Sequence, residues 1–126
     1  MVDALGNPIA LVLSAGQAHD IKAVPALLAE ADLAKRGVKA FIGDRSFDAD
    51  ALIEPLVEAN ITPVIPPKSN RKVKRHCDFA LYKERNLIER FFNKLKQFRA
   101  VATRYDKTAR NFLAGTKLAA ITIILN

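Results

Sequence analysis

Two acidic side chains stand at positions from which they could act on a ligand. Asp44 follows the short apolar run 38–42 and Gly43, and open α/β sheets bind their ligands at the carboxyl ends of such strands. Asp44 could instead be a loop aspartate that accepts hydrogen bonds from its own backbone, because the segment 43–50 is rich in residues typical of turns. The position of Asp44 is compatible with both interpretations.

Glu89 is the second acidic side chain, and it belongs to a group of four polar residues on one predicted helix. Tyr82, Arg85, Glu89 and Lys96 fall within roughly 60° of one another at about 100° per residue. Another side of the same helix carries an apolar stripe with alternating spacings of three and four: Ile88, Phe91, Leu95, Phe98, Ala102 and Tyr105. The helix can therefore bury one side and hold a phenol, a guanidinium, a carboxylate and an ammonium in line on another. The alternative is a solvated face with an ion pair between Arg85 and Glu89, worth about 0.2–0.5 kcal/mol.

Basic residues are concentrated around this helix. Residues 1–67 carry five basic and nine acidic side chains, a net charge of −4, whereas residues 68–110 carry fourteen basic and four acidic ones, a net charge of +10. The whole chain has a formal net charge of +7. Such a block indicates a surface for a polyanion, and nucleic acid rewards clustered Lys and Arg through counterion release. A well-solvated surface without a partner is the alternative.

Apolar runs and helical patterns predict the elements that position these residues. We expect strands at 2–5 and 9–14 around a turn, a helix at 24–35, a strand at 38–42, a helix at 49–59 capped by Asp48, a strand at 61–65, a mobile basic loop at 68–75, and helices at 81–102 and 108–125. The last helix is apolar almost all round, so we expect it to be buried. Short apolar strands that alternate with helices predict an α/β layer architecture with parallel strands.

The composition predicts one globular domain in the cytoplasm. Half of the 126 residues are hydrophobic, which is enough for a core. Cys77 is the single cysteine, so an intramolecular disulfide and a cysteine-based zinc site are excluded. The longest apolar run, 118–125, is shorter than the roughly 18 residues of a membrane-spanning helix, and the N-terminus lacks the pattern of a signal peptide. We therefore expect no membrane partner.

The order and spacing of these residues resemble a known family of enzymes. The pattern Tyr82-x2-Arg85-x3-Glu89-x6-Lys96 is similar to the Y-R-E-K signature of bacterial insertion-sequence transposases with a DDE active site. Further segments resemble the same family in the same order: Val-Asp-Ala-Leu-Gly-Asn-Pro, Gly-Gln-Ala-His-Asp, Gly-Asp-Arg-Ser-Phe-Asp-Ala-Asp, and Arg-Phe-Phe-Asn-Lys-Leu-Lys-Gln-Phe-Arg. The resemblance covers essentially all 126 residues.

The resemblance implies a fold and an activity. The fold would be RNase H-like, a mixed sheet with flanking helices, truncated at the N-terminus. Asp44 matches the second catalytic aspartate of the family and Glu89 its catalytic glutamate, and both would be metal ligands. Such enzymes cleave a DNA strand at the end of the element and join the freed 3′ hydroxyl to target DNA, with two Mg²⁺ ions about 3.5–4 Å apart. Mg²⁺ takes few carboxylates and keeps waters or substrate phosphates as its other ligands.

The same resemblance assigns DNA contacts to basic residues. Tyr82, Arg85 and Lys96 would position DNA phosphates and bases near the scissile bond. The basic loop, which leads at 68–81 into the helix of Glu89, would add sequence-independent affinity through five cations: Lys68, Arg71, Lys72, Lys74 and Arg75. The implied partners are the ends of an insertion sequence and target DNA, in the nucleoid of a bacterial cytoplasm. Family behaviour also implies a homodimer on paired ends.

The family has a further aspartate on its first strand, and this sequence offers no counterpart for it. The two upstream aspartates, Asp3 and Asp20, stand before a turn and before a helix, roles that need no catalysis. We therefore expect the chain alone to be marginally folded or self-associating, and inactive, because a central strand and one carboxylate are missing. A decayed remnant, the downstream product of a frameshift, and a segment that works with an upstream transposase polypeptide all stay open.

Two other functions are weighed against the catalytic one. A non-catalytic DNA-binding remnant would keep the basic helix and act as a regulator of the full-length transposase. A stand-alone metal-dependent nuclease is the weaker alternative, because two carboxylates without a third make a poor metal site.

Overall fold

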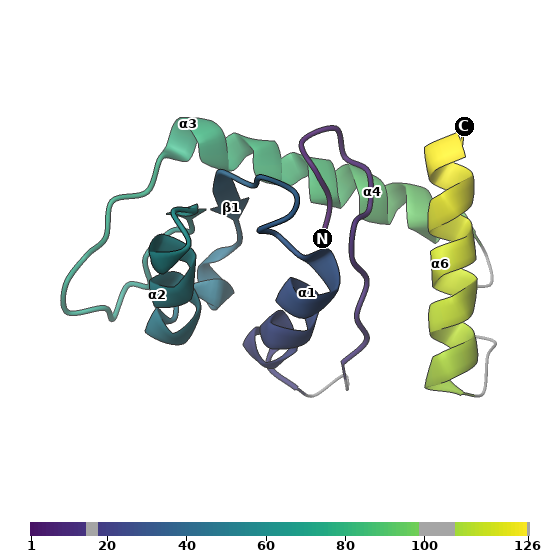
Figure 1. Cartoon of the computed structure of the whole chain (residues 1–126), viewed down its shortest axis with the longest axis horizontal. Coiled ribbons are helices and arrows are strands. Elements are labelled where there is room, and N and C mark those ends of the chain that lie inside the picture. The colour runs from purple at the N-terminus through teal and green to yellow at the C-terminus, as the bar shows by residue number, and fades with distance from the viewer. Residues whose placement is uncertain (15–17, 99–107, 126) are drawn as a thin grey trace. The chain divides into compact units, whose positions relative to one another are not determined.

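In the computed structural model, the regular elements of the described residues are helices and two short strands (Figure 1). Residues 1–14, 18–98 and 108–125 are described. They form two compact units: a terminal unit of Met1–Gly16 with Asn86–Asn126, and a central unit of Gln17–Arg85. The mixture of helices with parallel strands agrees with the predicted α/β class.

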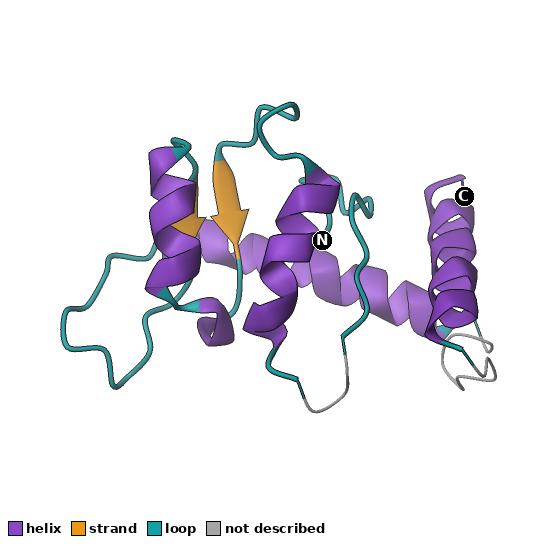
Figure 2. Ribbon diagram, turned by 60° about the horizontal axis from the view of Figure 1, so that its bottom comes forward, coloured by secondary structure: helices purple, strands orange, loops and turns teal. Residues whose placement is uncertain are grey.

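The central unit is built around a pair of parallel strands. β1 (Ala40–Ile42) and β2 (Thr62–Val64) pair in parallel, with Ile42 opposite Val64. The amide of Gly43 extends the pairing by donating to the Val64 carbonyl over 3.2 Å. Between the strands the chain forms a 3₁₀ turn, η2 (Arg45–Phe47), and the helix α2 (Asp50–Glu58), which packs on β2 (Figure 2). Both predicted strands and their parallel pairing are confirmed, although the strands are shorter than 38–42 and 61–65.

Helix α2 buries the side that its sequence predicts and ends at a residue in the left-handed region. Leu52, Ile53 and Leu56 are buried. Asn60 has φ of 58°, and the amide of Ile61 donates to the Leu56 carbonyl over 2.8 Å. A left-handed residue with this hydrogen bond is a common way to end a helix. The turn directs the chain from α2 into β2.

The first helix of the central unit ends earlier than predicted. A 3₁₀ turn, η1 (Asp20–Ala23), leads into α1 (Val24–Ala31), so the predicted end at residue 35 is wrong. Asp32 takes a left-handed conformation with φ of 46°, and the Arg36 side chain donates to the Ala31 carbonyl over 2.7 Å. Side-chain capping of this kind satisfies a carbonyl that the helix leaves open, so the helix need not continue.

The predicted helix 81–102 is interrupted. α3 (Phe79–Tyr82) begins after Asp78, whose carboxylate accepts hydrogen bonds from the amides of Ala80 and Leu81 over 3.0 and 3.1 Å. A 3₁₀ turn, η3 (Lys83–Arg85), follows, and α4 (Asn86–Lys96) comes next. The described residues stop at 98 and resume at 108. The single continuous helix is therefore wrong at its start and in its middle, and 99–102 lie outside the described residues.

The N-terminal segment turns back on itself without forming two strands. A single antiparallel bridge joins Val2 and Pro8, so the predicted strands at 2–5 and 9–14 are wrong. Gly6 takes φ of 83° in the turn, a conformation that glycine adopts without strain. Pro8 has no amide hydrogen to give, which limits the ladder on this side of the turn.

Helix α6 (Ala109–Leu125) forms as predicted but is only partly buried. Its small residues Ala119 and Ala120 pack with Phe91 and Leu95 of α4 in the core of the terminal unit. Four large apolar side chains of α6 are exposed, which contradicts the predicted burial: Leu118, Ile121, Ile124 and Leu125. Helix α6 therefore carries apolar side chains on sides that the described residues of its unit do not cover.

No helix within the described ranges is long and apolar enough to cross a membrane.

We predict that Phe91→Ala destabilises the chain far more than Phe92→Ala. Phe91 is 2% exposed in the core of the terminal unit, whereas its neighbour Phe92 is 49% exposed. Loss of a buried Phe side chain costs about 3–5 kcal/mol, and loss of a surface one costs about 0.5 kcal/mol or less. Urea unfolding of both variants measures the free energies of unfolding, and equal losses would contradict the assigned core.

Candidate functional site

Asp44 lies at the carboxyl end of β1, where the sequence predicts a ligand-binding carboxylate. Its Oδ1 accepts a hydrogen bond from the Ser46 amide over 2.7 Å and another from the Ser46 hydroxyl. The Asp44 carboxylate thereby caps η2. The turn role considered for this aspartate is therefore real. Among the described residues, Oδ2 has no hydrogen-bond partner, and the side chain is half-buried at the surface of the central unit. One oxygen fixes the turn, and the other stays available to a ligand.

Gly43 joins β1 to Asp44 and is buried. A Cβ at this position would lie 3.4 Å from ring atoms of both Phe41 and Phe47 and 3.5 Å from Ile65, which is close to ordinary van der Waals contact. The amide of Gly43, which donates to the Val64 carbonyl, fixes the backbone that leads to Asp44.

Glu89 lies on α4 and its side chain is exposed. It belongs to the terminal unit, whereas Asp44 belongs to the central unit. Within the part of the chain that the structure describes, no group of three or more His, Cys, Asp or Glu side chains could hold a metal ion. The convergence of Asp44 and Glu89 on shared metal ions stays a prediction.

The four signature residues are divided by the 3₁₀ turn η3. Tyr82 ends α3 and Arg85 ends η3, whereas Glu89 and Lys96 lie two helical turns apart on α4, both exposed. The prediction of one common face assumes 100° per residue throughout, but a 3₁₀ turn advances by about 120°. Glu89 and Lys96 share a side of α4, and the alignment of all four stays a prediction.

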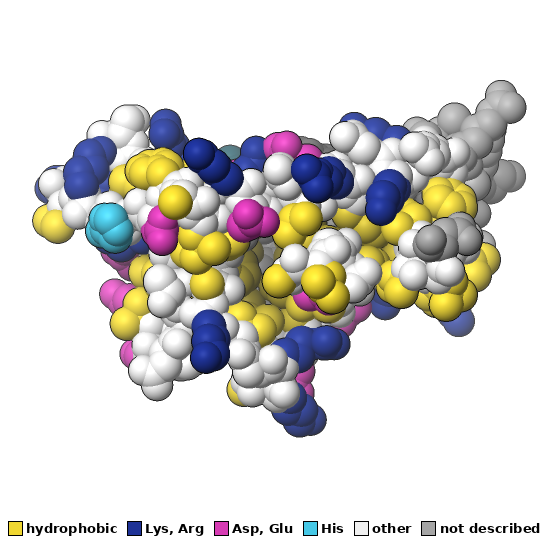
Figure 3. Space-filling model, turned by 90° about the horizontal axis from the view of Figure 1, so that it is seen from above, with side chains coloured by type: hydrophobic (Ala, Val, Ile, Leu, Met, Phe, Trp, Pro, Cys, Tyr) yellow, Lys and Arg dark blue, Asp and Glu magenta, His cyan; other side chains and the backbone are white. Residues whose placement is uncertain are grey.

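Tyr82 and Arg85 form a local aromatic cluster with Phe79. The guanidinium carbon of Arg85 lies 5.9 Å from the centre of the Tyr82 ring, within the range of a cation–π contact. The Phe79 ring meets the Tyr82 ring edge-on, with centroids 6.1 Å apart. Exposed Lys and Arg side chains lie along the α3–α4 segment (Figure 3), including Lys83, Arg90, Lys94 and Lys96. The segment thus combines aromatic rings with positive charge, as nucleic-acid surfaces do.

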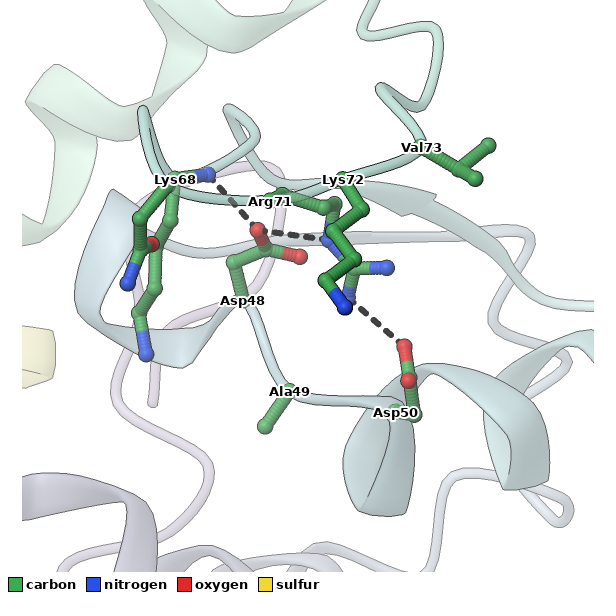
Figure 4. A pocket seen from close by; sticks show the side chains of 8 residues that line it. Asp48, Ala49, Asp50, Lys68, Arg71, Lys72 and Val73 are labelled. Carbon is green, nitrogen blue, oxygen red and sulfur yellow. Dashed lines mark hydrogen bonds and ion pairs between the residues drawn. The ribbon is translucent and has the colours of Figure 1, made fainter.

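The basic loop 68–75 is held in place by one buried carboxylate. Asp48 accepts hydrogen bonds from the Lys68 amide over 2.7 Å, from Arg71 Nε over 3.0 Å and from Arg75 Nη2 over 2.6 Å. Arg71 also pairs with Asp50 through Nη2 over 2.6 Å (Figure 4). The loop was predicted as mobile, but these contacts tie both of its ends and its middle to the start of α2.

Asp48 was predicted to cap α2, and that prediction is wrong. The N-cap residue of α2 is Ala49, without a side-chain cap hydrogen bond. The Asp48 side chain is fully buried and directed to the loop instead. Two arginines and a backbone amide are stronger partners for a buried carboxylate than the helix terminus, since charge-assisted hydrogen bonds gain strength away from water.

The remaining cations of the loop have different surroundings. Lys74 Nζ donates to the carbonyls of Lys68 and Ser69, each over 2.7 Å, and so closes the loop on itself. Lys72 is exposed and lines a pocket of about 510 Å³ together with Asp48, Asp50, Lys68, Asn70 and Arg71 (Figure 4). Of the five predicted DNA-binding cations, Arg71, Lys74 and Arg75 are thus held by protein groups, whereas Lys68 and Lys72 line the pocket.

The surroundings of Asp48 decide its charge. Burial raises the pKa of Asp48, but the hydrogen bonds from Arg71, the Lys68 amide and Arg75 outweigh that effect and hold the pKa well below its usual value. The hydrogen bond to Asp48 raises the pKa of Arg71 further above its ordinary value. At neutral pH both partners are therefore ionised.

The structure also describes three other side chains that could act chemically: Asp3, Cys77 and Asp20. Asp3 accepts hydrogen bonds from the amides of Leu5 and Asn7, both over 2.9 Å, so its predicted turn role is confirmed. Cys77, at the end of the loop, is buried, and its burial raises the pKa of the thiol. Asp20 begins η1. None of these observations makes Asp3 or Asp20 a substitute for a third metal ligand.

The chain matches the family described as "Transposase DDE domain" over residues 1–125 and belongs to that family. The resemblance to DDE transposases of insertion sequences is therefore confirmed.

A curated relative points to the same class of element. The chain is 35% identical over 127 aligned positions to a protein of Brucella ovis named "Putative transposase for insertion sequence element IS6501". The alignment covers 99% of this chain and 94% of that relative. No solved structure matches the chain.

The low pKa of Asp48 predicts how the loop responds to acid. A carboxyl whose pKa is lowered by folding stabilises the fold fully above its unfolded pKa of about 4 and loses that contribution as the pH falls through its folded pKa. We expect the amide proton of Lys68, which donates to Asp48, to show no NMR titration between pH 7 and about pH 4 and to shift only below that.

The comparison with Asp48→Asn isolates this contribution. Its loss of unfolding free energy relative to the unaltered chain should be constant above about pH 5 and should shrink in stronger acid. Removal of the charge leaves two arginines about one-fifth exposed, so we expect a loss of about 1–3 kcal/mol at neutral pH, less than for a fully buried pair. A titration centred at pH 4 or higher would contradict the assigned contacts.

Proposed function

We propose that this chain supplies Asp44 and Glu89 to a DDE active site that cleaves and transfers DNA strands at the ends of an insertion sequence. The observation that carries the proposal is the position of Asp44 at the carboxyl edge of the parallel strands in a chain of the transposase DDE family. Ligands of open α/β sheets bind at this edge. The turn hydrogen bonds of Asp44 fix the carboxylate and leave Oδ2 for the ligand.

The carboxylates suit the metal that the family implies. Mg²⁺ prefers oxygen donors and is held by one or two carboxylates together with substrate phosphates and waters. Asp44, with its available Oδ2, and Glu89, with its exposed carboxylate, are the residues that would hold it. When bound, such ions stabilise the charge that develops on the attacking and leaving oxygens at the phosphorus.

The basic residues would bind and orient the DNA. Arg85 lies four residues before Glu89 and Lys96 seven residues after it, so both bring positive charge to this segment. The Tyr82 ring, which Arg85 contacts, would add aromatic surface for a base. Arg suits bidentate contact with a phosphate, and Lys contributes a point charge. These side chains would hold the scissile phosphate against the carboxylates, and the loop 68–75 would add affinity that does not depend on sequence.

A third carboxylate completes the DDE set, and we propose that it comes from an upstream transposase polypeptide. Asp3 is occupied by the turn at residues 3–7, and the described residues hold no three-ligand group. The chain by itself is then inactive in strand transfer and gains activity when the upstream polypeptide is added. Activity of the purified chain alone with Mg²⁺ would contradict this part of the proposal.

Glu89→Gln tests the catalytic role. In a preparation with the upstream polypeptide, a duplex carrying an element end and Mg²⁺, we expect strand transfer to fall by about a thousandfold or more, since an essential group is lost. DNA affinity should be unchanged. Glu84→Gln is the matched control, because Glu84 is an exposed carboxylate in η3 of the same segment. Strand transfer that survives Glu89→Gln would favour the non-catalytic DNA-binding regulator.

The charge of the signature residues is tested by salt dependence. The double variant Arg85→Gln with Lys96→Gln should bind duplex DNA more weakly and lower the slope of log affinity against log salt by about 2, because two phosphate contacts are lost. Lys22→Gln with Lys39→Gln removes two exposed cations from the acidic part of the chain and should leave the slope unchanged. Equal salt slopes in the two double variants would contradict the phosphate contacts assigned to Arg85 and Lys96.

A further inference from the structure

Three of the five cations of the basic loop 68–75 are held by contacts within the protein. Arg71 and Arg75 pair with Asp48, and Lys74 donates to two carbonyls of the loop itself. Nε and Nη1 of Arg75 are buried, and neither has a hydrogen-bond partner among the described residues. Since these nitrogens are closed off from solvent, a DNA phosphate cannot reach them in this arrangement.

Lys68 and Lys72 are the two loop cations whose ammonium groups are not held by such contacts, and both line the pocket beside Asp48. The Lys68 backbone is fixed by its amide hydrogen bond to Asp48, while no partner of either ammonium group is found among the described residues. Lys72 follows Arg71 directly, so the pairs of Arg71 with Asp48 and Asp50 fix the backbone from which Lys72 projects. The contacts of Asp48 therefore fix the backbone that carries the exposed side chain of Lys72 and the half-buried side chain of Lys68.

Burial makes Asp48 dependent on the loop. Its side chain has no exposure to solvent, and a buried charge without partners is far more costly than one that is fully hydrogen-bonded. All three of its donors come from residues that lie 20 to 27 positions further along the chain. The folded central unit therefore requires the loop to be closed on Asp48.

We propose that Asp48 is a positioning residue for DNA binding: it holds the loop so that Lys68 and Lys72 contact duplex phosphates, while Arg71 and Arg75 are anchors. The proposal rests on the DNA binding proposed above and separates the five loop cations into two functions. Although Asp48 is negatively charged, its presence increases affinity for a polyanion, because a fixed loop loses less conformational freedom on binding.

The direction of one effect distinguishes this role from simple competition. If Asp48 only competed with DNA for Arg71, then Asp48→Asn would free a cation, remove a negative charge and tighten DNA binding. If Asp48 positions the loop, the same substitution weakens binding despite the gain in positive charge. Glu54→Gln is the matched control, since Glu54 is exposed on α2 and its change removes one negative charge outside the loop contacts.

The experiment measures the full chain with a 30-base-pair duplex of arbitrary sequence by fluorescence anisotropy at several salt concentrations. For Asp48→Asn we expect about tenfold weaker binding near 0.1 M salt and a salt slope lower by about 1–2, as for the loss of two phosphate contacts. Glu54→Gln should bind equally well or slightly more tightly. A general loss of stability would reduce the fraction of active protein but would leave the salt slope unchanged.

Limited trypsin digestion of the same variants measures how often the loop opens in the absence of DNA. Cleavage after Arg71, Lys72, Lys74 or Arg75 should be slow in the unaltered chain and about tenfold faster in Asp48→Asn, because local opening exposes the loop. Should Asp48→Asn fail to fold, Arg71→Lys replaces it: this variant keeps the charge and loses the paired contacts to Asp48 and Asp50. It should show the same lower slope and faster cleavage.

The outcomes separate this inference from the proposed function. An unaltered chain that fails to bind the duplex overturns the proposed DNA binding, and the digestion still tests whether Asp48 anchors the loop. Unchanged or tighter binding by Asp48→Asn, with slow cleavage in the loop, overturns the positioning role and leaves the proposed function standing. An unchanged salt slope in Arg71→Lys overturns the role in the same way.

Discussion

The buried carboxylate of Asp48 is the constraint on which the central unit depends. It lies between Phe47, which ends η2, and Ala49, the N-cap of α2, and it gathers three donors from a loop that follows β2. A charge in this position is tolerated only while those donors are present. The turn after β1, the start of α2 and the basic loop are therefore coupled through one side chain.

This coupling also relates the predicted catalytic residue to the predicted DNA-binding loop. Asp44 and Asp48 stand four residues apart on either side of η2. The Asp44 carboxylate accepts the Ser46 amide and so fixes the turn, and the Asp48 carboxylate accepts the Lys68 amide and so holds the basic loop. One short segment, 44–48, thus sets both the carboxylate proposed to hold metal and the lysines proposed to hold phosphate.

Local patterns in the sequence predicted most of the helices and the paired strands. Features that depend on contacts between distant residues could not be predicted in this way. The stripe with Phe91 and Leu95 predicted the buried side of α4, and the runs around Phe41 and Val64 predicted parallel strands. The partners of Asp48 could not be predicted, because its donors are 20 to 27 residues away, although a carboxylate among turn residues followed by a basic loop is a usable signal. The 3₁₀ turn η3 and the exposed side of α6 likewise depend on neighbours that periodicity does not reveal.

The buried thiol of Cys77 gives the chain a reporter that needs no engineering. Because thiolate is the species that reacts with alkylating reagents, a thiol that is both shielded and raised in pKa is modified slowly. Cys77 follows Arg75 by two residues, and the Arg75 charge acts on its thiol, so we expect release of the loop from Asp48 to expose this thiol. The rate at which iodoacetamide labels this one sulfur therefore records, in the unaltered protein, how often the segment after β2 comes away from its anchor.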